Sequence, residues 1–149
     1  MAVDYDILNE ILSTYGTRNG PNCAECMFLY GLRGFKIDVP SEMLRIATPF
    51  GGGMGVAEDT CGVLTGGMIL IGLKYGRSSL DGDKQRTYRI AKRYFNWFIE
   101  AFGSTNCRQL NGGEYNTPTH RQRCGGFITK ALGYLDGLFK EMDSEQSAS

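Results

Sequence analysis

The stretch DTCGVLTGGMILIGLKY, residues 59–75, decides the fold that this sequence predicts. Its residues are apolar on nearly all sides of a helix, a pattern typical of a helix buried at the centre of a bundle. Gly62 and Gly66 lie four residues apart on one face of this helix. Each glycine costs the helix about 1 kcal/mol relative to alanine. The pair therefore indicates that a neighbouring helix or a cofactor comes close to the backbone here.

Amphipathic segments flank this central helix on both sides. Apolar residues recur at helical spacing from Ile7 to Tyr15, and shorter helices are expected at 23–30 and from Ser41 to near Pro49. The longest helix is expected at 83–102, with Gly103 as its C-terminal cap. Its aromatic stripe is predicted to lie mostly in the core and comprises Tyr88, Phe95, Phe98 and Phe102.

A last helix carries Cys124, Ile128 and Leu135 at helical spacing, so Cys124 is expected to point inward. No alternating strand pattern occurs in the chain. The sequence therefore predicts an all-α, single-domain bundle of about five or six helices around a buried glycine-rich helix. We expect this helical domain to span 1–142, and residues 143–149 have the composition of a disordered C-terminal tail.

Four cysteines stand apart along the chain, each near an expected helix start. Three of them directly follow a residue type that caps helix N-termini: Cys23 follows Asn22, Cys61 follows Thr60 and Cys107 follows Asn106. Cys124 comes a few residues after another plausible start at 118–119. The free N–H groups and partial positive charge of a helix N-terminus lower the pKa of a thiol. This placement predicts nucleophilic or metal-binding sulfurs.

The composition excludes several classes of protein. Sixteen basic and sixteen acidic residues cancel, and no basic stripe is present, so nucleic acid is not expected as a partner. The apolar stretch 63–73 is shorter than the ~20 residues that a membrane span requires. The acidic N-terminus does not resemble a signal peptide, so we expect a cytoplasmic protein. In that reducing compartment, cysteines are metal ligands or redox-active thiols more often than disulfides.

The spacing of the cysteines disfavours some kinds of site but does not select a single one. Cys23 and Cys26 form a Cys-x-x-Cys pair, but the sequence lacks the βαβ setting of a thioredoxin and the histidine of a c-type haem site. The other cysteines stand singly, which disfavours zinc. Four single thiols brought together by a bundle could hold an iron–sulfur cluster, form two redox disulfides, or pack as small core residues. His120 is expected to be exposed and is left out of the site.

The sequence resembles the small family called C_GCAxxG_C_C, whose members carry four characteristic cysteines. The resemblance rests on segments 22–25, 47–55, 61–66 and 102–107 and on Cys124, with Val63 replacing the alanine of the family motif. It implies a helical domain like that of split-Soret cytochromes c, where an iron–sulfur centre and haem occur in a dimer. Only the four-cysteine site carries over, to Cys23, Cys61, Cys107 and Cys124, because the chain has no haem attachment motif. Cys26 departs from the family pattern. A fifth ligand, a resolving thiol and a core residue are all open interpretations, and we favour the core residue.

We therefore expect a protein that carries or senses electrons through a [2Fe–2S] or [4Fe–4S] cluster held by these four cysteines. Exposed aromatic residues on the long helix suggest a homodimer, and electron transfer implies a redox partner protein that the sequence does not identify. Two alternatives stay open. One is a metal-free thiol–disulfide oxidoreductase in which Cys26 acts as a resolving thiol. The other is a module that binds or senses a metal or metalloid without turnover.

Overall fold

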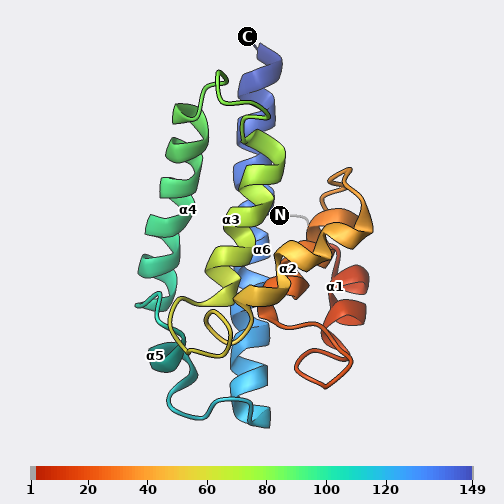
Figure 1. Ribbon diagram of the computed structural model, residues 1–149, viewed down its shortest axis with the longest axis vertical. Coiled ribbons are helices and arrows are strands. Elements are labelled where there is room, and N and C mark those ends of the chain that lie inside the picture. Colours follow the sequence, from red (N-terminus) through yellow and green to blue (C-terminus); the bar gives the residue numbers. More distant parts are fainter. Residues whose placement is uncertain (1–2, 149) are drawn as a thin grey trace.

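The glycine-rich stretch is the central helix α3, Gly62–Tyr75, in the computed structural model, which describes residues 3–148. It packs against α2 (Cys23–Arg33), α4 (Gln85–Phe102) and α6 (Pro118–Ala148). Figure 1 shows α3 running along α6 in the middle of the molecule. The described residues form helices and no β-strand, so the predicted all-α fold is confirmed.

Glycines allow α3 to occupy this central position. A Cβ added at Gly66 would lie 2.8 Å from Met27 Cβ in α2, and one at Gly67 would lie 2.4 Å from Tyr94 Cε2 in α4. Contacts this short are not tolerated in a close-packed interior. The expectation of close helix packing at the glycines is therefore confirmed on two faces of α3.

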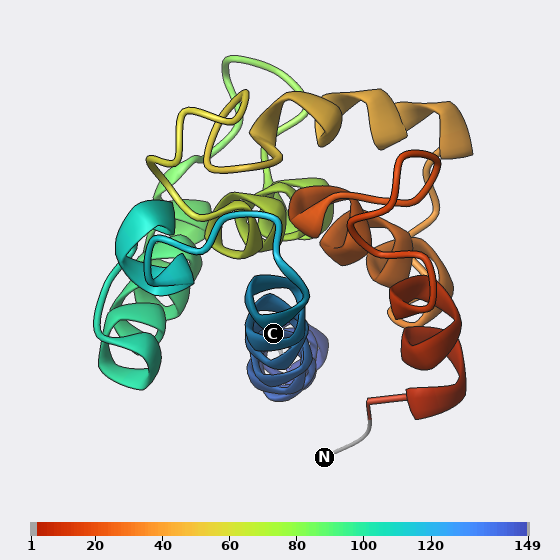
Figure 2. The same cartoon turned by 90° about the horizontal axis from the view of Figure 1, so that it is seen from below.

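Shorter elements complete the bundle. α1 (Tyr5–Leu12) packs on α2, and α5 (Cys107–Asn111) precedes the loop into α6. Seen from below, α6 lies between α4 and α5 on one side and α1 and α2 on the other (Figure 2). The helix expected from Ser41 is instead two 3₁₀ turns, η1 (Ser41–Ile46) and η2 (Thr48–Phe50). Pro49 in η2 has no N–H with which an α-helix could continue past it.

The buried face of α4 differs from the predicted aromatic stripe. Ile90, Tyr94 and Phe98 are buried, whereas Tyr88 is 58% exposed and Phe95 is 39% exposed. The Tyr94 hydroxyl donates a hydrogen bond to the Val63 carbonyl oxygen at 2.7 Å. The fit of Tyr94 against α3 thus sets the rotation of α4 and turns part of the stripe outward. Gly103 ends the helix with φ +83°, as predicted for a C-terminal cap.

The C-terminal segment also differs from expectation. We predicted a disordered tail from Asp143, but α6 continues through Ala148. Asp143 accepts hydrogen bonds from the Tyr75 hydroxyl at 2.8 Å and from Lys74 Nζ at 3.2 Å, which tie this end of α6 to α3. Residue 149 lies outside the described residues. Within 3–148, no helix has the length and apolar character that crossing a membrane requires.

Candidate functional site

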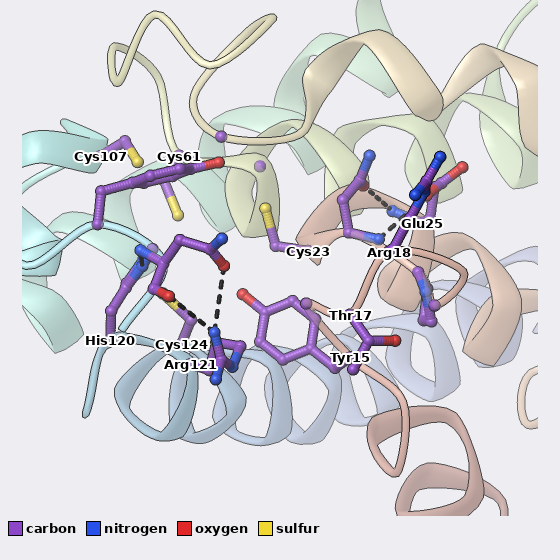
Figure 3. Close-up of a pocket in the computed structure, with 18 residues that line it drawn as sticks. Tyr15, Thr17, Arg18, Cys23, Glu25, Cys61, Cys107, His120, Arg121 and Cys124 are labelled. Atoms are coloured by element: carbon purple, nitrogen blue, oxygen red, sulfur yellow. Dashed lines mark hydrogen bonds between the residues drawn. The ribbon is translucent and has the colours of Figure 1, made fainter. Parts of the chain in front are cut away.

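All four predicted cysteines line one cavity at an end of the bundle. The cavity has a volume of about 340 Å³, within the range of small-molecule sites. Figure 3 shows the sulfurs of Cys23, Cys61 and Cys107 and the hydroxyl of Tyr15 around the same space, with Cys124 on α6 beside them. Three of the predicted positions at helix starts are confirmed, since Cys23 and Cys107 are first residues of helices and Cys61 is the N-cap of α3. Cys124 lies in the second turn of its helix.

A capping box holds Cys23 at the start of α2. Asn22 Oδ1 accepts a hydrogen bond from the Glu25 N–H at 2.8 Å, and the Glu25 carboxylate accepts one from the Asn22 N–H at 3.0 Å. The Thr48 hydroxyl donates to the same carboxylate at 2.8 Å, and Asn22 Nδ2 donates to the Thr48 carbonyl oxygen at 3.1 Å. The helix start that carries Cys23 is therefore fixed to η2.

The Cys23 sulfur lies at the meeting point of two helix N-termini. Backbone N–H groups of Ala24, Gly52 and Gly62 are directed at it. A Cβ at Gly62 would come 2.3 Å from this sulfur, so only glycine permits the approach. Gly62 therefore lets the backbone of α3 come close to the Cys23 sulfur in the cavity. Gly66 instead lets α2 pack closely against α3.

A short antiparallel backbone contact positions Cys61 and Cys107. Thr60 and Asn106 form an isolated β-bridge, and the Cys61 N–H donates to the Thr105 carbonyl oxygen at 2.8 Å. The Cys107 N–H donates in turn to the Asp59 carbonyl oxygen. Asn106 also caps α5 by accepting from the Gln109 N–H at 3.0 Å. The backbones of two cysteines distant in sequence are thereby held beside one another.

The glycine loop 51–55 covers the cavity next to Cys107. Gly52 and Gly53 have φ values of +63° and +73°, which glycine adopts without a steric penalty. A Cβ at Gly52 would lie 2.5 Å from the Tyr115 hydroxyl oxygen, and one at Gly53 would lie 2.7 Å from Cys107 Cβ. The loop therefore lets the backbone come close to Tyr115 and Cys107.

Burial outweighs the helix N-termini in setting the pKa values of the thiols. We expected lowered values, but burial raises the pKa of Cys23, Cys61 and Cys107. For Cys23, the surrounding backbone N–H groups oppose this increase. Burial raises the pKa of Cys124 to about 12. Without a bound metal, these thiols are therefore protonated at neutral pH.

His120 belongs to the cavity, contrary to our expectation of an exposed residue. It is only 5% exposed, and its ring centroid lies 5.1 Å from that of Tyr115. The Asn116 N–H donates to its Nδ1 at 2.6 Å, so the neutral ring carries its proton on Nε2. Burial lowers the pKa of this imidazole. One turn of helix separates His120 from Cys124, and this i, i+4 spacing was the available signal.

Tyr15 is a second cavity residue that sequence reasoning assigned only to an apolar stripe. Its side chain packs against the core while its hydroxyl faces the cavity (Figure 3). The Tyr15 and Cys124 side chains line the same cavity, and burial raises the pKa of this phenol. No spacing in the sequence singles out Tyr15, because it follows α1 and reaches the site only through tertiary packing.

Two arginines and one carboxylate, that of Glu25, line the cavity. Arg18 and Arg121 both line it, and neither forms an ion pair with a carboxylate in the described part of the chain. Arg121 instead donates to the Asn116 carbonyl oxygen at 2.7 Å. Of the other arginines near the cysteines, Arg108 pairs with Glu58 at 3.4 Å and Arg123 with Glu114 at 3.6 Å.

Cys26 does not line the cavity. It is fully buried within the main hydrophobic core, in agreement with the interpretation as a core residue. All five cysteines carry free thiols. Within residues 3–148, no three or more His, Cys, Asp and Glu side chains are grouped as a metal ion would require. The four thiols thus share a cavity without forming a compact ligand set.

Comparison with known proteins gives one match. A family model described as "Putative redox-active protein (C_GCAxxG_C_C)" matches residues 21–138, which include all four cavity cysteines and begin after Tyr15. No curated protein and no solved structure matches the chain.

Proposed function

Because this chain belongs to the C_GCAxxG_C_C family, we propose that it carries or senses electrons through an iron–sulfur cluster. The observation that supports this proposal is that Cys23, Cys61, Cys107 and Cys124 line a single cavity. Four thiolates are the usual ligand set of [2Fe–2S] and [4Fe–4S] clusters, and cysteines from separate elements can supply it. A bound cluster would provide one-electron chemistry, and these four residues would hold it.

The charges around the cavity support an anionic occupant. α2 and α3 both begin at the cavity, and their N-termini direct partial positive charge and free N–H groups toward it. Arg18 and Arg121 add two guanidinium groups that form no ion pair within the described residues, against the single carboxylate of Glu25 in the lining. A cluster with four thiolate ligands is negatively charged, so this lining would offset its charge.

Loading would change the protonation of the site. Because burial raises the pKa values of the four thiols, each is protonated before a metal binds. Metal ligation requires thiolates, so loading would release about one proton per cysteine. It would also require the side chains to turn toward one another, since they are not grouped as metal ligands in the described structure.

The proposal also covers the cellular location, the redox partner and the oligomeric state. We place the protein in the cytoplasm, where a redox partner protein would exchange electrons with it. Tyr88, Phe95 and Ile99 are exposed on α4 and would form the contact of the proposed homodimer. Light scattering of the wild type and of Phe95→Glu would test the dimer. A monomeric mass for the wild type would exclude the homodimer.

Metal-free dithiol chemistry is the second candidate, in which pairs of these cysteines cycle through disulfides. It is favoured by the absence of a compact metal-ligand group within residues 3–148. The raised thiol pKa values weigh against it, because thiol–disulfide exchange proceeds through the thiolate. In this case, oxidant would remove free thiols in even numbers from colourless protein.

Iron and acid-labile sulfide content, with a visible spectrum, separates the two candidates in protein purified without oxygen. We expect near-stoichiometric iron and sulfide and a brown chromophore. Colourless protein that takes up neither element during reconstitution would exclude the cluster. Tight metal binding without sulfide or a redox response would favour a metal-binding or metalloid-binding module.

Substitution of single cysteines tests which thiols are ligands. Cys61→Ser should abolish cluster assembly, because the Cys61 thiol lines the cavity. Cys26→Ala is the matched control, since Cys26 is buried in the core outside the cavity lining. It should lower the free energy of unfolding while leaving the iron and sulfide per folded chain unchanged. Equal iron content in wild type and Cys61→Ser would show that Cys61 is not a ligand.

A further inference from the structure

His120 presents an unpartnered hydrogen-bond donor to the cavity. This residue is 5% exposed, and its Nδ1 accepts from the Asn116 N–H, so the proton is on Nε2. Nε2 has no hydrogen-bond partner within residues 3–148. No side-chain nitrogen or oxygen of the described residues is both enclosed and unpartnered, so this N–H reaches the open space that His120 lines, which is the cavity. A buried donor of this kind indicates a ligand that accepts from it.

Asn116 also holds a second donor, the guanidinium group of Arg121. Arg121 Nη1 donates to the Asn116 carbonyl oxygen at 2.7 Å and to Asn116 Oδ1 at 3.3 Å. The remaining guanidinium N–H groups have no partner in the described part of the chain. Asn116 has φ +60°, a left-handed conformation that is uncommon outside glycine. A single loop residue therefore orients both donors.

The stem of Arg121 is fixed as well. A Cβ at Gly16, where φ is +79°, would lie 2.2 Å from Arg121 Cδ, so the stem packs directly on the Gly16 backbone. Figure 3 shows His120 and Arg121 on the α6 side of the cavity, with the sulfurs of Cys23 and Cys61 on the other side. The two donors are thus held in place before any ligand binds, which reduces the entropy that binding costs.

The charge on this side of the cavity suits an anion. His120 and Arg121 lie at the start of α6, where the helix N-terminus carries partial positive charge. Arg121 forms no ion pair within residues 3–148. The carboxylate in the lining, that of Glu25, already accepts from the Asn22 N–H and the Thr48 hydroxyl. Both free donors lack acceptor capacity, so they fit a ligand with several acceptor oxygens.

We propose that the α6 side of the cavity binds a small oxyanion of the sulfate type through His120 Nε2–H and the Arg121 guanidinium. This site goes beyond the proposed function, because it requires neither iron nor sulfide. No covalent bond forms or breaks on binding, and the imidazole stays neutral. The bound anion would share the cavity with the four thiols.

NMR of the reduced, metal-free protein tests the site directly, because His120 gives the only imidazole signals of this chain. Protein with ¹⁵N-labelled histidine is titrated at neutral pH with sodium sulfate, and separately with sodium chloride at equal ionic strength. We expect the Nε2–H signal to shift with sulfate until it saturates, and to stay in place with chloride. Equal shifts with the two salts, or no shift, would overturn the proposal.

Two arginine variants separate a specific site from general charge attraction. Arg121→Gln removes the proposed donor. Arg123→Gln removes the same charge from the same helix, but Arg123 pairs with Glu114 and does not line the cavity. Arg121→Gln should weaken sulfate binding about ten-fold, the effect of losing one hydrogen bond to a charged group, while Arg123→Gln should change it about two-fold or less. Equal weakening by the two folded variants, checked by circular dichroism, would contradict the assignment.

The result does not depend on the proposed function. Saturable sulfate binding by protein that never takes up iron would support the oxyanion site and leave the cluster excluded. Iron uptake by protein whose Nε2–H signal does not respond to sulfate would overturn the oxyanion site and leave the cluster proposal standing.

Discussion

Gly62→Ala should disturb the site and the fold together, because the added methyl group has no space. The new Cβ would lie 2.3 Å from Cys23 Sγ, 3.0 Å from the Phe50 carbonyl oxygen and 3.3 Å from the Ala24 nitrogen. The sulfur can rotate away only by leaving the N–H groups directed at it, and the two backbone atoms cannot move independently. The added methyl group therefore forces a local rearrangement.

The expected size follows from opposing effects. Overpacking in a filled interior costs about 1–3 kcal/mol, and alanine recovers at most about 1 kcal/mol of helix propensity. We expect the free energy of unfolding to fall by about 1 kcal/mol, the middle of the overpacking range less the propensity gain. At about 2–4 °C per kcal/mol for a chain of this size, Tm should fall by roughly 2–4 °C.

Gly72→Ala is the matched control within α3. A Cβ at Gly72 has nothing within 4 Å, so the substitution gains helix propensity without a clash. Its free energy of unfolding should rise by about 0.5–1 kcal/mol. Urea unfolding of both variants, reduced and metal-free, measures the difference. Equal stability of Gly62→Ala and Gly72→Ala would refute the steric argument.

A double-mutant cycle identifies the atom responsible. If the clash is with the Cys23 sulfur, Gly62→Ala should cost about 1 kcal/mol less in a Cys23→Ala background than in the wild type. An unchanged cost would assign the clash to the Phe50 and Ala24 backbone atoms instead, and would refute the inference that Gly62 is required by the sulfur.

Three further substitutions or conditions have defined outcomes. Tyr94→Phe should lower the free energy of unfolding by about 1 kcal/mol, because it removes the buried hydrogen bond to the Val63 carbonyl oxygen; an unchanged urea midpoint would contradict that role. Gly103→Ala should lower the free energy of unfolding by about 1 kcal/mol. The cost is conformational, since φ is +83° and a Cβ there meets nothing within 4 Å. An unchanged Tm in thermal unfolding would contradict this expectation. The reduced, metal-free protein should lose stability as pH rises above about 9. The pKa of Cys124 is raised within the fold from 9.0 to about 12, so its stabilising contribution is complete below pH 9 and is lost as pH approaches 12. Urea unfolding at pH 7, 9 and 10 would detect the decline, which Cys124→Ala should reduce.

The central helix could be predicted from the sequence because its signal is local. Residues 62–75 are apolar around the whole helix, and no surface helix has that pattern. The helix starts at Cys23 and Cys107 could also be predicted from the sequence, since the side chains of Asn22 and Asn106 cap these two helices. The gathering of the four cysteines around one cavity followed from the family resemblance, not from spacing.

The remaining features depend on tertiary packing. The rotation of α4 is set by Tyr94 fitting against Gly67, so the aromatic residues alone could not define its buried face. The thiol pKa values depend on burial, which sequence position at a helix start does not reveal. Tyr15 enters the cavity from a loop that Arg121 crosses, a contact between residues about a hundred positions apart. No local pattern encodes such a contact.

The residues that line the cavity are far apart in the sequence, so the cavity can form only late in the synthesis of this part of the chain. Its four thiols come from residues 23, 61, 107 and 124, and α6, which follows the other described helices in the sequence, supplies the final wall. A chain still emerging from the ribosome can form α1 to α4 yet has no complete cavity. Any occupant must therefore be received after Cys124 and α6 have been made, and a product that terminates before them would lack the complete site. Occupancy of this cavity would thus report that the chain has been made and folded as far as α6.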